Sequence, residues 1–249
     1  MTAAHRSSQN LVILTGAGIS QESGLETFRD ADGIWEKVRL EDVATPEAFA
    51  HFPERVHQFY NARRRQLLSD AVRPNAAHLA LAHLEQQWRG RLLLVTQNID
   101  DLHERAGSKN VIHMHGELLK ARCNACSRVT ACRQDLSAKA SCPDCSSIGS
   151  MRPHVVWFGE VPMSLGEIID ELEQCDLFIS IGTSGSVYPA AGFVESARLT
   201  GAIVVELNME PSANARSFTE RNYGPATMIV PSYVRRLLRN HTDGKSQLL

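Results

Sequence analysis

The sequence predicts an α/β fold in which a mostly parallel sheet is covered by helices on both faces. Residues 11–14 are four apolar residues, two of them β-branched, which is typical of a strand buried on both faces. Similar apolar runs recur along the chain with helix-length stretches between them, as in a doubly covered parallel sheet. The first run leads directly into Gly16-Ala17-Gly18, and a strand that enters a glycine turn is how α/β folds hold dinucleotides.

Length and composition limit the class of protein. The 249 residues are enough for one large domain or for a domain with a small satellite, and an apolar content of 43% supplies a core. A net charge of −2 argues against a dedicated nucleic-acid binder. No run approaches the roughly 18 apolar residues of a membrane span, and residues 1–10 lack the apolar centre of a secretion signal, so we expect a cytoplasmic protein.

Two segments interrupt the strand–helix alternation. Residues 28–75 look helical and loop-like, and residues 116–152 carry cysteines but few long apolar runs. We expect both to be insertions that form a smaller lobe over the carboxyl edge of the sheet. The sheet domain then comprises residues 1–27, 76–115 and 153–249. Beyond the first run, strands are predicted at residues 92–95, 110–115, 154–158, 176–181, 202–207 and 228–230.

The glycine turn after residue 15 has two interpretations. Gly16 and Gly18 let the chain turn sharply and bring backbone N–H groups against a bound group, for which a phosphate is the natural guest. The alternative is that the glycines serve the turn alone, because the spacing is G-x-G and the third glycine of the dinucleotide fingerprint is missing. These residues by themselves leave both interpretations open.

Four of the six cysteines have the spacing of a zinc ribbon. They form two C-x-x-C pairs separated by fifteen residues: Cys123, Cys126, Cys142 and Cys145. Two such pairs complete a closed tetrahedron of thiolates with no open position for water, so the spacing predicts a structural zinc ion instead of a catalytic one. We expect the two remaining thiols, Cys132 and Cys175, to be buried and inert.

A helical stretch over residues 54–70 places an arginine among apolar side chains. At 3.6 residues per turn, the residues that share one stripe are Val56, Phe59, Tyr60 and Leu67, with Arg63 in its middle and Arg64 and Arg65 progressively further off. One interpretation is that Arg63 reaches water or meets a carboxylate elsewhere in the fold. The other is that Arg63 and Tyr60 point into a pocket for an anionic ligand, because an unpaired guanidinium there is costly. Periodicity alone favours the first.

Polar residues follow several of the predicted strands. Gln97, Asn98 and Asp100 come after residues 92–95, at the edge where α/β folds bind ligands. Asn98 or Asp100 could equally cap a helix over residues 101–106.

Two histidines, His113 and His115, lie near the end of the next strand and on the same side of it, so at least one is expected to face the crevice. A histidine at a strand end can act as a general base, although a lone histidine is more often structural. Four further residues close two later strands, where they suit ribose or phosphate contacts and turn chemistry equally well: Gly182, Thr183, Ser184 and Asn208.

Together these motifs resemble those of a known family. GAGIS, TFR (Thr27-Phe28-Arg29), TQNID, HMHGE, two C-x-x-C pairs, VVWFGE, IGTS and ELN occur in the order found in sirtuins, the NAD-dependent protein-lysine deacylases, over about residues 10–238. The chain also resembles the bacterial and mitochondrial-type subclass that removes succinyl and malonyl groups, because Tyr60-x-x-Arg63 and Ala44 ahead of Thr-Pro match its motifs. The resemblance implies a Rossmann-like sheet with helices on both faces, plus a small lobe made of a zinc ribbon and a helical insertion.

The resemblance also implies a role for each matching position. NAD, consumed as a co-substrate, would contact Gly16, Ala17, Gly18 and Ile19 at the pyrophosphate; Phe28, Arg29 and Trp35 at the nicotinamide end; Gln97, Asn98, Ile99 and Asp100 at the nicotinamide and its ribose; and Gly182, Thr183, Ser184, Asn208, Met209, Glu210 and Ala226 at the adenosine half. The acyl-lysine peptide would add as a strand between residues 155–160 and 185–188. Its contacts would be Ala44, Tyr60, Arg63, Val156, Phe158, Gly159 and Val187.

The implied reaction consumes NAD instead of reducing it. The amide oxygen of the acyl-lysine attacks C1′ of the nicotinamide ribose as nicotinamide leaves, and His115, with Asn98 and Asp100 in the same site, acts as general base on a ribose hydroxyl. The products are free lysine, nicotinamide and O-acyl-ADP-ribose. In such a site Arg63 would take the carboxylate of a succinyl or malonyl group while Tyr60 donates its hydroxyl. Activity is expected to fall below about pH 6.5 as His115 becomes protonated.

Other functions fit parts of the sequence. The chain could be chiefly a deacetylase, or it could transfer ADP-ribose to protein, in which case label from NAD stays on the protein. A Rossmann oxidoreductase would convert NAD to NADH, and a zinc-ribbon binding module would need no cofactor. We expect a monomer whose partners are acylated-lysine proteins or peptides, with no direct contact to nucleic acid or membrane.

Overall fold

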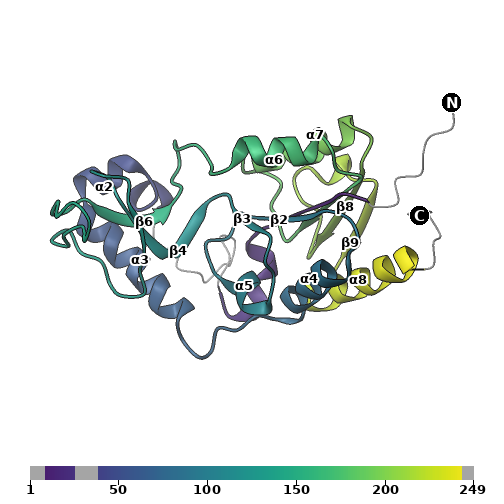
Figure 1. Ribbon diagram of the computed structural model, residues 1–249, viewed down its shortest axis with the longest axis horizontal. Helices are drawn as coiled ribbons and strands as arrows, with labels where there is room; N and C mark the ends of the chain where they lie inside the picture. The colour runs from purple at the N-terminus through teal and green to yellow at the C-terminus, as the bar shows by residue number, and fades with distance from the viewer. Residues whose placement is uncertain (1–8, 26–38, 243–249) are drawn as a thin grey trace.

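A parallel sheet of six strands forms the centre of the structure, a computed structural model that describes residues 9–25 and 39–242 (Figure 1). The strand order is β3-β2-β1-β7-β8-β9, and every neighbouring pair is parallel. The strands are β1 (Leu11–Thr15), β2 (Leu92–Thr96), β3 (Val111–His113), β7 (Leu177–Ile181), β8 (Ile203–Asn208) and β9 (Glu220–Tyr223). The predicted α/β fold class is confirmed.

Helices cover both faces of this sheet (Figure 1). They are α4 (Ala76–Gln87) and α8 (Ala226–Thr242) on one face, and α6 (Leu165–Leu172) and α7 (Phe193–Leu199) on the other. Leu11 and Ile13 of β1 pack on the α4–α8 side, while Val12 and Leu14 pack on the α6–α7 side. All four are at most 3% exposed, which is why a uniformly apolar run identified this doubly covered strand.

A second sheet and two helices form the small lobe, which lies at the opposite end of the molecule from α7 and α8 (Figure 1). In this sheet β4 pairs antiparallel with both β5 and β6. The elements of the small lobe are α2 (Pro46–His51), α3 (Pro53–Leu67), β4 (Gly116–Cys123), β5 (Val129–Ala131) and β6 (Met151–Val155). The predicted helix over residues 54–70 is α3, which begins with a proline at its first position, where no intrahelical N–H is needed.

The strand order reverses between β1 and β7. From β1 the chain proceeds outward to β2 and β3, and from β7 it proceeds outward to β8 and β9 on the other side. α/β folds bind ligands at the carboxyl ends of strands that meet at such a point. Thr15 and Ile181 end the two strands in register, and Gly16 and Gly182 follow them directly. The topology therefore places both glycine loops at the edge where a ligand site is expected.

The structure corrects the strand predictions at three places. Residues 228–230 lie in α8 and not in a strand, because buried side chains continue at helical spacing through Val230, Tyr233, Val234 and Leu237. Residues 154–158 overlap only the end of β6, which belongs to the antiparallel sheet of the small lobe. Strand β9 was not predicted, since its sequence ERNY is that of a polar edge strand without an apolar run.

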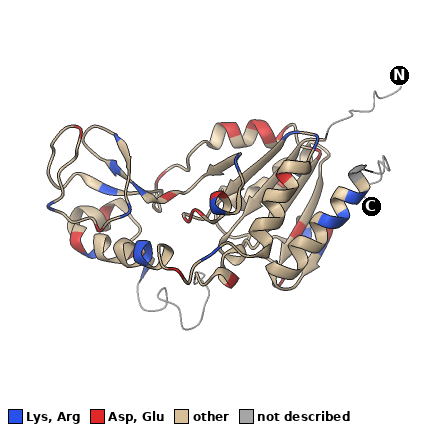
Figure 2. Cartoon of the chain, turned by 60° about the horizontal axis from the view of Figure 1, so that its bottom comes forward, with Lys and Arg blue, Asp and Glu red and all other residues tan. Residues whose placement is uncertain are grey.

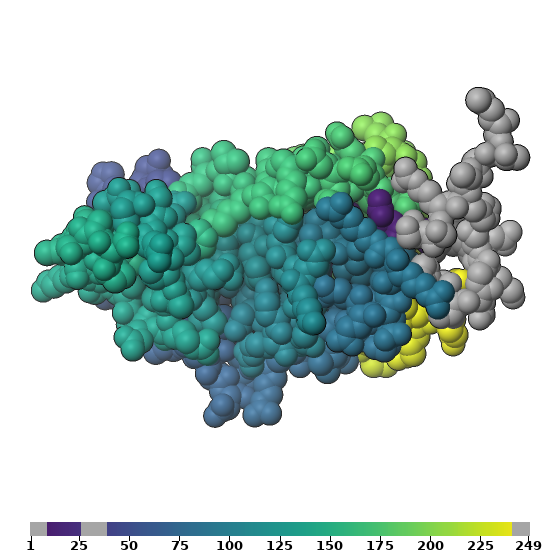
Figure 3. Space-filling view, in the orientation of Figure 1, coloured from purple at the N-terminus to yellow at the C-terminus, as the bar shows by residue number. Residues whose placement is uncertain are grey.

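The described helices include none that is both long and apolar enough to cross a membrane. Figure 2 shows Lys and Arg interspersed with Asp and Glu at both ends of the molecule, in keeping with the net charge of −2. On the face shown in Figure 3, the small lobe and helices α6 and α7 form a continuous surface.

Candidate functional site

Three glycines bring two loops into backbone contact at the ends of β1 and β7. The N–H of Gly16 donates to the Ile181 carbonyl at 3.0 Å, and the N–H of Gly18 donates to the Gly182 carbonyl at 2.9 Å. A Cβ on Gly16 would lie 2.7 Å from the Gly182 carbonyl oxygen, and a Cβ on Gly18 would lie 2.8 Å from Gly182 Cα. Gly182 itself has a φ of +62°, and a Cβ on it would lie 2.6 Å from the Ile19 nitrogen. The close approach of the two loops therefore requires all three glycines.

This packing bears on the two interpretations of the glycine turn. The N–H groups of Gly16 and Gly18 are both bonded within the fold, so a phosphate held by backbone N–H groups of this turn would use its neighbours. Among the described residues, no acceptor is found for the N–H groups of Ala17, Thr183 and Ser184 at the same junction. All three residues are partly exposed, and their backbone donors fit the oxygens of a diphosphate.

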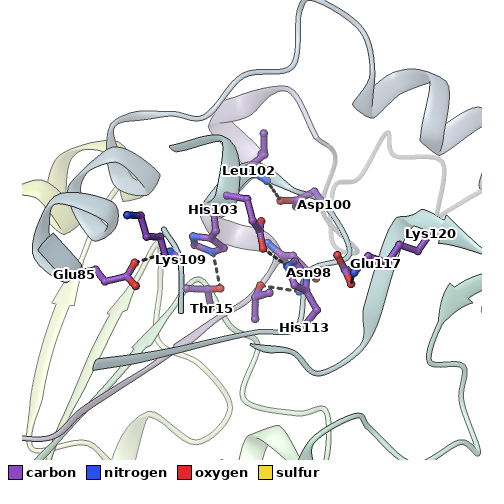
Figure 4. A network of polar contacts seen from close by, with 12 residues as sticks. Thr15, Glu85, Asn98, Asp100, Leu102, His103, Lys109, His113, Glu117 and Lys120 are labelled. Carbon is purple, nitrogen blue, oxygen red and sulfur yellow. Dashed lines mark hydrogen bonds and ion pairs between the residues drawn. The ribbon is translucent and has the colours of Figure 1, made fainter. Parts of the chain in front are cut away.

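The polar residues after β2 form a buried hydrogen-bond network (Figure 4). Asn98 Nδ2 donates to the Gly16 carbonyl and to Ser20 Oγ, each at 3.1 Å, and the Ser20 hydroxyl donates to Asp100 Oδ2 at 3.1 Å. The other oxygen of Asp100 accepts the Leu102 N–H at 3.1 Å, at the start of α5 (Leu102–Ala106). Burial raises the pKa of Asp100 to about 6. Asp100 therefore accepts the first N–H of α5, whose N-cap residue is Asp101, and also belongs to the crevice network.

Sequence analysis missed Ser20 and two buried histidines near it. His78 Nδ1 accepts the Asn75 N–H at 3.3 Å, so its Nε2 carries the hydrogen and faces Ser20 Oγ at 3.5 Å. His103 Nε2 lies 3.0 Å from Thr15 Oγ1 (Figure 4), and the two imidazole rings are 4.9 Å apart. Burial lowers the pKa of both rings, that of His78 to about 4, so both are neutral at pH 7. The only local signal was the capping spacing of Asn75 and His78.

His115 lies in the turn between β3 and β4. Its Nδ1 is 3.1 Å from the Gln97 carbonyl oxygen. A carbonyl can only accept, so we assign the hydrogen to Nδ1 and the lone pair to Nε2. Burial lowers the pKa of His115 from its usual 6.5, so the ring is a neutral base at pH 7. The carbonyl of His115 accepts the Val156 N–H at 2.9 Å, which ties this turn to the segment after β6.

His113, at the end of β3, has a different environment from His115. Its Nε2 is 2.6 Å from Glu104 Oε1, and its Nδ1 is 3.3 Å from the Asn98 carbonyl oxygen. Burial acts to lower the pKa of His113, but the hydrogen bond and the charge of Glu104 outweigh burial and raise it. The two histidines therefore have opposite pKa shifts, and His113 has both ring nitrogens engaged.

The residues predicted to hold the acyl group meet in the core of the small lobe. Ala44, Tyr60 and Trp157 belong to one apolar cluster, and each is at most 7% exposed. Trp157 Nε1 donates to the hydroxyl oxygen of Tyr60 at 3.0 Å. Arg63 follows Tyr60 on α3, is half-buried, and has its guanidinium carbon 5.1 Å from the centre of the Phe59 ring. Burial raises the pKa of Tyr60 to about 12, so this hydroxyl keeps its proton.

The three consecutive arginines of α3 differ in burial, and the order of their burial is not the predicted one. Arg64, expected to lie off the apolar stripe, is 0% exposed, whereas Arg63 is half-buried and Arg65 is exposed. Arg64 Nε donates to the Leu118 carbonyl at 3.1 Å and Nη1 donates to Asn61 Oδ1 at 2.8 Å. The prediction was wrong because α3 buries a second stripe of residues. Within it, Arg64 bonds β4, Asn61 bonds the backbone of Leu136, and His57 packs against the Phe49 ring.

The residues predicted at the adenosine half lie beyond the ends of β7 and β8. Asn208 Nδ2 donates to the Thr183 carbonyl at 2.9 Å, which joins the two strand ends. Met209 and Glu210 follow Asn208 and are exposed, and Ala226 is the first residue of α8. Ile99, predicted with Gln97, Asn98 and Asp100 at the nicotinamide end, is partly buried and packs against the core of the small lobe. Phe28, Arg29 and Trp35 lie outside the described residues.

The segment predicted to receive the peptide is already bonded on one side. The Phe158 N–H donates to the Ala44 carbonyl at 3.0 Å, and the Val156 N–H is used by His115 as described. The Phe158 side chain is 53% exposed and that of Val187 is 40% exposed. Gly159 has a φ of +89° with open space where a Cβ would be. A strand added here would therefore meet backbone carbonyls and exposed apolar side chains instead of a full row of N–H donors.

The two C-x-x-C pairs bring four sulfurs together in the small lobe. The sulfurs of Cys123, Cys126, Cys142 and Cys145 all lie within 4.8 Å of one another. The sulfurs of Cys123 and Cys145 are 3.7 Å apart, and so are those of Cys126 and Cys142. Thiolates bound tetrahedrally to zinc at about 2.3 Å are about 3.8 Å apart, so this cluster fits the ion. The set is closed and made only of thiolates, which is typical of a structural site.

The two remaining cysteines are buried, as predicted. Cys132 is 8% exposed and its sulfur lies 3.4 Å from the Gln134 carbonyl oxygen. Cys175 is 5% exposed, and burial raises the pKa of its thiol to about 11. A thiol with so high a pKa is unreactive at pH 7.

Comparisons with known proteins agree on one family. The model of the Sir2 family matches residues 16–189. An NAD-dependent protein deacylase of Vibrio cholerae is 56% identical over 237 residues, which are 95% of this chain and 96% of that relative. An NAD-dependent protein deacylase of Escherichia coli K12 is 58% identical over 94% of this chain and 84% of that relative. Two solved structures are similar: a Sir2 homologue–NAD complex (TM-score 0.85, 37% identity, 94% of this chain and 92% of that one) and a Sir2 variant with a deacetylated p53 peptide and 3′-O-acetyl ADP ribose (TM-score 0.79, 33% identity, 94% of each chain).

Proposed function

Since this chain belongs to the Sir2 family and is an NAD-dependent protein deacylase, we propose that it removes succinyl and malonyl groups, as well as acetyl groups, from protein lysines. One observation carries the acyl preference: Tyr60 and Arg63 lie on α3 beside the core of the small lobe, with Trp157 and Ala44 close to Tyr60. Succinyl and malonyl groups end in a carboxylate, which a guanidinium can bind through two parallel hydrogen bonds. An acetyl group offers no anion to these residues.

The hydroxyl of Tyr60 supports the same preference. A carboxylate only accepts hydrogen bonds, so the residue that faces it has to donate. Burial raises the pKa of Tyr60 to about 12, which keeps the donor protonated at any working pH. A substrate without an acceptor would leave this polar group unpaired, and mismatches of that kind discriminate strongly between substrates.

We assign the base of the reaction to Nε2 of His115. NAD, when bound, supplies an electrophilic ribose carbon and the ribose hydroxyls. His115 is neutral at pH 7, its Nδ1 is held by the Gln97 carbonyl, and Nε2 is therefore the nitrogen that can take a proton from a ribose hydroxyl. Asn98 and Asp100, held by Ser20, would orient the ribose and the nicotinamide.

The rest of the crevice would bind the remainder of the nucleotide. We propose that the N–H groups of Ala17, Thr183 and Ser184 hold the diphosphate, and that Asn208 and Ala226 border the adenosine. The zinc cluster would have no part in the chemistry and would stabilise the small lobe. We also propose the division of the chain into a sheet domain of residues 1–27, 76–115 and 153–249 and a small lobe of residues 28–75 and 116–152, with the last boundary moved beyond Trp157, because β6 pairs with β4 and Trp157 packs in the core of the small lobe. We propose that the protein acts as a monomer on acylated-lysine peptides.

The acyl preference can be tested by mass spectrometry of matched peptides. Acetyl-, malonyl- and succinyl-lysine forms of one peptide are incubated with the chain, with and without NAD. We expect release of all three acyl groups only with NAD, together with nicotinamide and O-acyl-ADP-ribose. Label from NAD that stays on the protein would instead indicate ADP-ribosyl transfer.

The variant Arg63→Met isolates the proposed carboxylate contact. It should lose desuccinylation at least tenfold more than deacetylation, because only the succinyl group uses the guanidinium. Arg65→Met, on the same helix but exposed and paired with Asp135, is the matched control and should change neither rate. Equal losses of both activities in Arg63→Met would remove Arg63 from substrate choice.

A further inference from the structure

Trp157 is the only residue among those described that forms a hydrogen bond with the hydroxyl of Tyr60. The bond joins two buried side chains that lie 97 positions apart in the sequence, at 3.0 Å, and Tyr60 and Trp157 are 3% and 2% exposed. An indole N–H can donate but has no lone pair with which to accept. Tyr60 must therefore use a lone pair toward Trp157, and its own proton is directed elsewhere.

We propose that Trp157 is a positioning residue that determines acyl specificity by making Tyr60 a hydrogen-bond donor toward the acyl group. This inference rests on the proposed function and deepens it. An acidic acyl group ends in oxygens that only accept, so the hydroxyl recognises it only when its proton points that way. A residue that could accept at position 157 would compete for the same proton. The indole N–H of Trp157 cannot accept the Tyr60 proton, and the Trp157 side chain lies in the same apolar cluster as the ring of Tyr60.

An ion pair between Arg152 and Glu160 lies against the indole ring of Trp157. The guanidinium carbon of Arg152 lies 3.3 Å from the centre of the ring, and Arg152 is 3% exposed. Arg152 donates to both carboxylate oxygens of Glu160, at 2.6 and 2.9 Å, and to the Val155 carbonyl at 2.7 Å. Glu160 also accepts the backbone N–H of Trp157 at 2.8 Å. Backbone and side chain of Trp157 are thus restrained by the same pair.

This ion pair also strengthens the contact with Tyr60. A cation over the face of an aromatic ring is attracted to its electrons, and it polarises the N–H bond at the ring edge. A hydroxyl that accepts a stronger hydrogen bond becomes a better donor, because bonds in a chain polarise one another in a medium of low dielectric. The order of donation runs from Trp157 through Tyr60 to the acyl carboxylate.

The test is a double-mutant cycle on substrate selectivity with Trp157→Phe and Tyr60→Phe. Trp157→Phe keeps an aromatic ring but removes the N–H, so we expect kcat/KM for succinyl-lysine peptide to fall roughly fivefold, mainly through KM, with little change for acetyl-lysine peptide. In the Tyr60→Phe background, Trp157→Phe should cause no further change in the succinyl-to-acetyl ratio. Trp88→Phe is the matched control, since it removes a buried indole N–H that donates to the Gln9 carbonyl at 2.9 Å, and it should leave the ratio unchanged.

A spectroscopic measurement keeps the inference testable if Trp157→Phe does not fold. In protein labelled with 15N-tryptophan, the indole signal of Trp157 should shift in Tyr60→Phe. In the unmutated chain it should shift on addition of succinyl-lysine peptide more than on addition of the acetyl-lysine peptide. Equal shifts with both peptides would overturn the inference, as would equal loss of both activities in Trp157→Phe or full additivity with Tyr60→Phe.

The two proposals can fail separately. If the unmutated chain shows no activity on succinyl-lysine or malonyl-lysine peptide, the proposed acyl preference is wrong and this inference is wrong with it. If that activity is present and depends on Arg63, but survives in Trp157→Phe with its selectivity intact, only the role of Trp157 is overturned.

Discussion

His115 donates its Nδ1 hydrogen to the carbonyl oxygen of Gln97 at 3.1 Å, and this single bond leaves the lone pair of the neutral ring on Nε2. The same bond orients the ring from the carboxyl end of β2, next to the Asn98 and Asp100 network. Because Gln97 directly follows β2, a fully buried strand of the parallel sheet, the His115 ring is positioned by the core of the sheet domain.

The first prediction concerns the pH dependence of deacylation. In the proposed mechanism the neutral form of His115 is the active one, and burial lowers the pKa of His115 below the usual 6.5. The neutral form therefore persists as the pH falls to 6.5 and is lost only below it, so kcat/KM should be constant above pH 6.5 and decline on the acid side of it. His115→Ala should lower kcat about 10²- to 10⁴-fold. A rate that stays constant through the acid range in which the chain remains folded would contradict the assignment.

The second prediction concerns the pair of Glu104 and His113. Glu104 raises the pKa of His113, which bonds the Asn98 carbonyl through its other nitrogen. Glu104→Gln should lower the pKa of His113, because burial then dominates, and loosen the support of Asn98. We expect the His113 ring signal to titrate at lower pH by NMR, together with a severalfold loss of kcat at pH 7.5. An unchanged titration would show that Glu104 does not control this ring.

The third prediction concerns the zinc cluster. Cys126→Ser should reduce bound zinc from one ion per chain and lower the melting temperature by about 10 °C or more, because a structural zinc site contributes folding free energy directly. Cys175→Ala, away from the cluster, should keep one zinc ion per chain. Metal analysis and thermal unfolding check both variants. Retention of a full zinc ion by Cys126→Ser would contradict the four-thiolate site.

The fourth prediction concerns Arg64, which helical periodicity placed off the apolar stripe but which is fully buried. Arg64→Met removes a buried donor from the Leu118 carbonyl and one of the two donors of Asn61 Oδ1, which keeps the Leu136 N–H, so the free energy of unfolding should fall by about 2–4 kcal/mol. Urea denaturation measures this. Arg65→Met should change stability by less than about 1 kcal/mol, because its pair with Asp135 is exposed. A succinyl-to-acetyl ratio altered in Arg64→Met as strongly as in Arg63→Met would show that the two arginines are not distinct.

The sequence allowed the central strands to be predicted better than the edges. Strands β1, β2, β7 and β8 are buried on both faces, so each begins with a run of at least three apolar residues that marks it as a strand. Strand β9 pairs on one side only and is polar, and the first turns of α8 carry the β-branched run Ile229-Val230 just before Pro231. The missed strand β9 and the strand wrongly predicted at residues 228–230 have one cause. In both segments tertiary packing decides the secondary structure, and the local apolar pattern does not.

The same contrast holds for the site. Cysteine spacing is a short-range geometric requirement of the metal, so the cluster could be predicted from the positions of four cysteines in the sequence. The supporting roles of Ser20, His78 and Trp157 depend on contacts across 58 to 97 positions. The burial of Arg64 depends on β4 covering the helix. No local pattern encodes such contacts.

The loops that carry Gly16 and Gly182 come from the two halves of the sheet and touch backbone to backbone. Neither half of the chain, expressed as a fragment, could form the cradle for a dinucleotide alone. A ligand seated across both loops would hold the halves together, so its binding energy would add to the cost of separating them. Binding of NAD would thus raise the free energy of unfolding of the protein that consumes it.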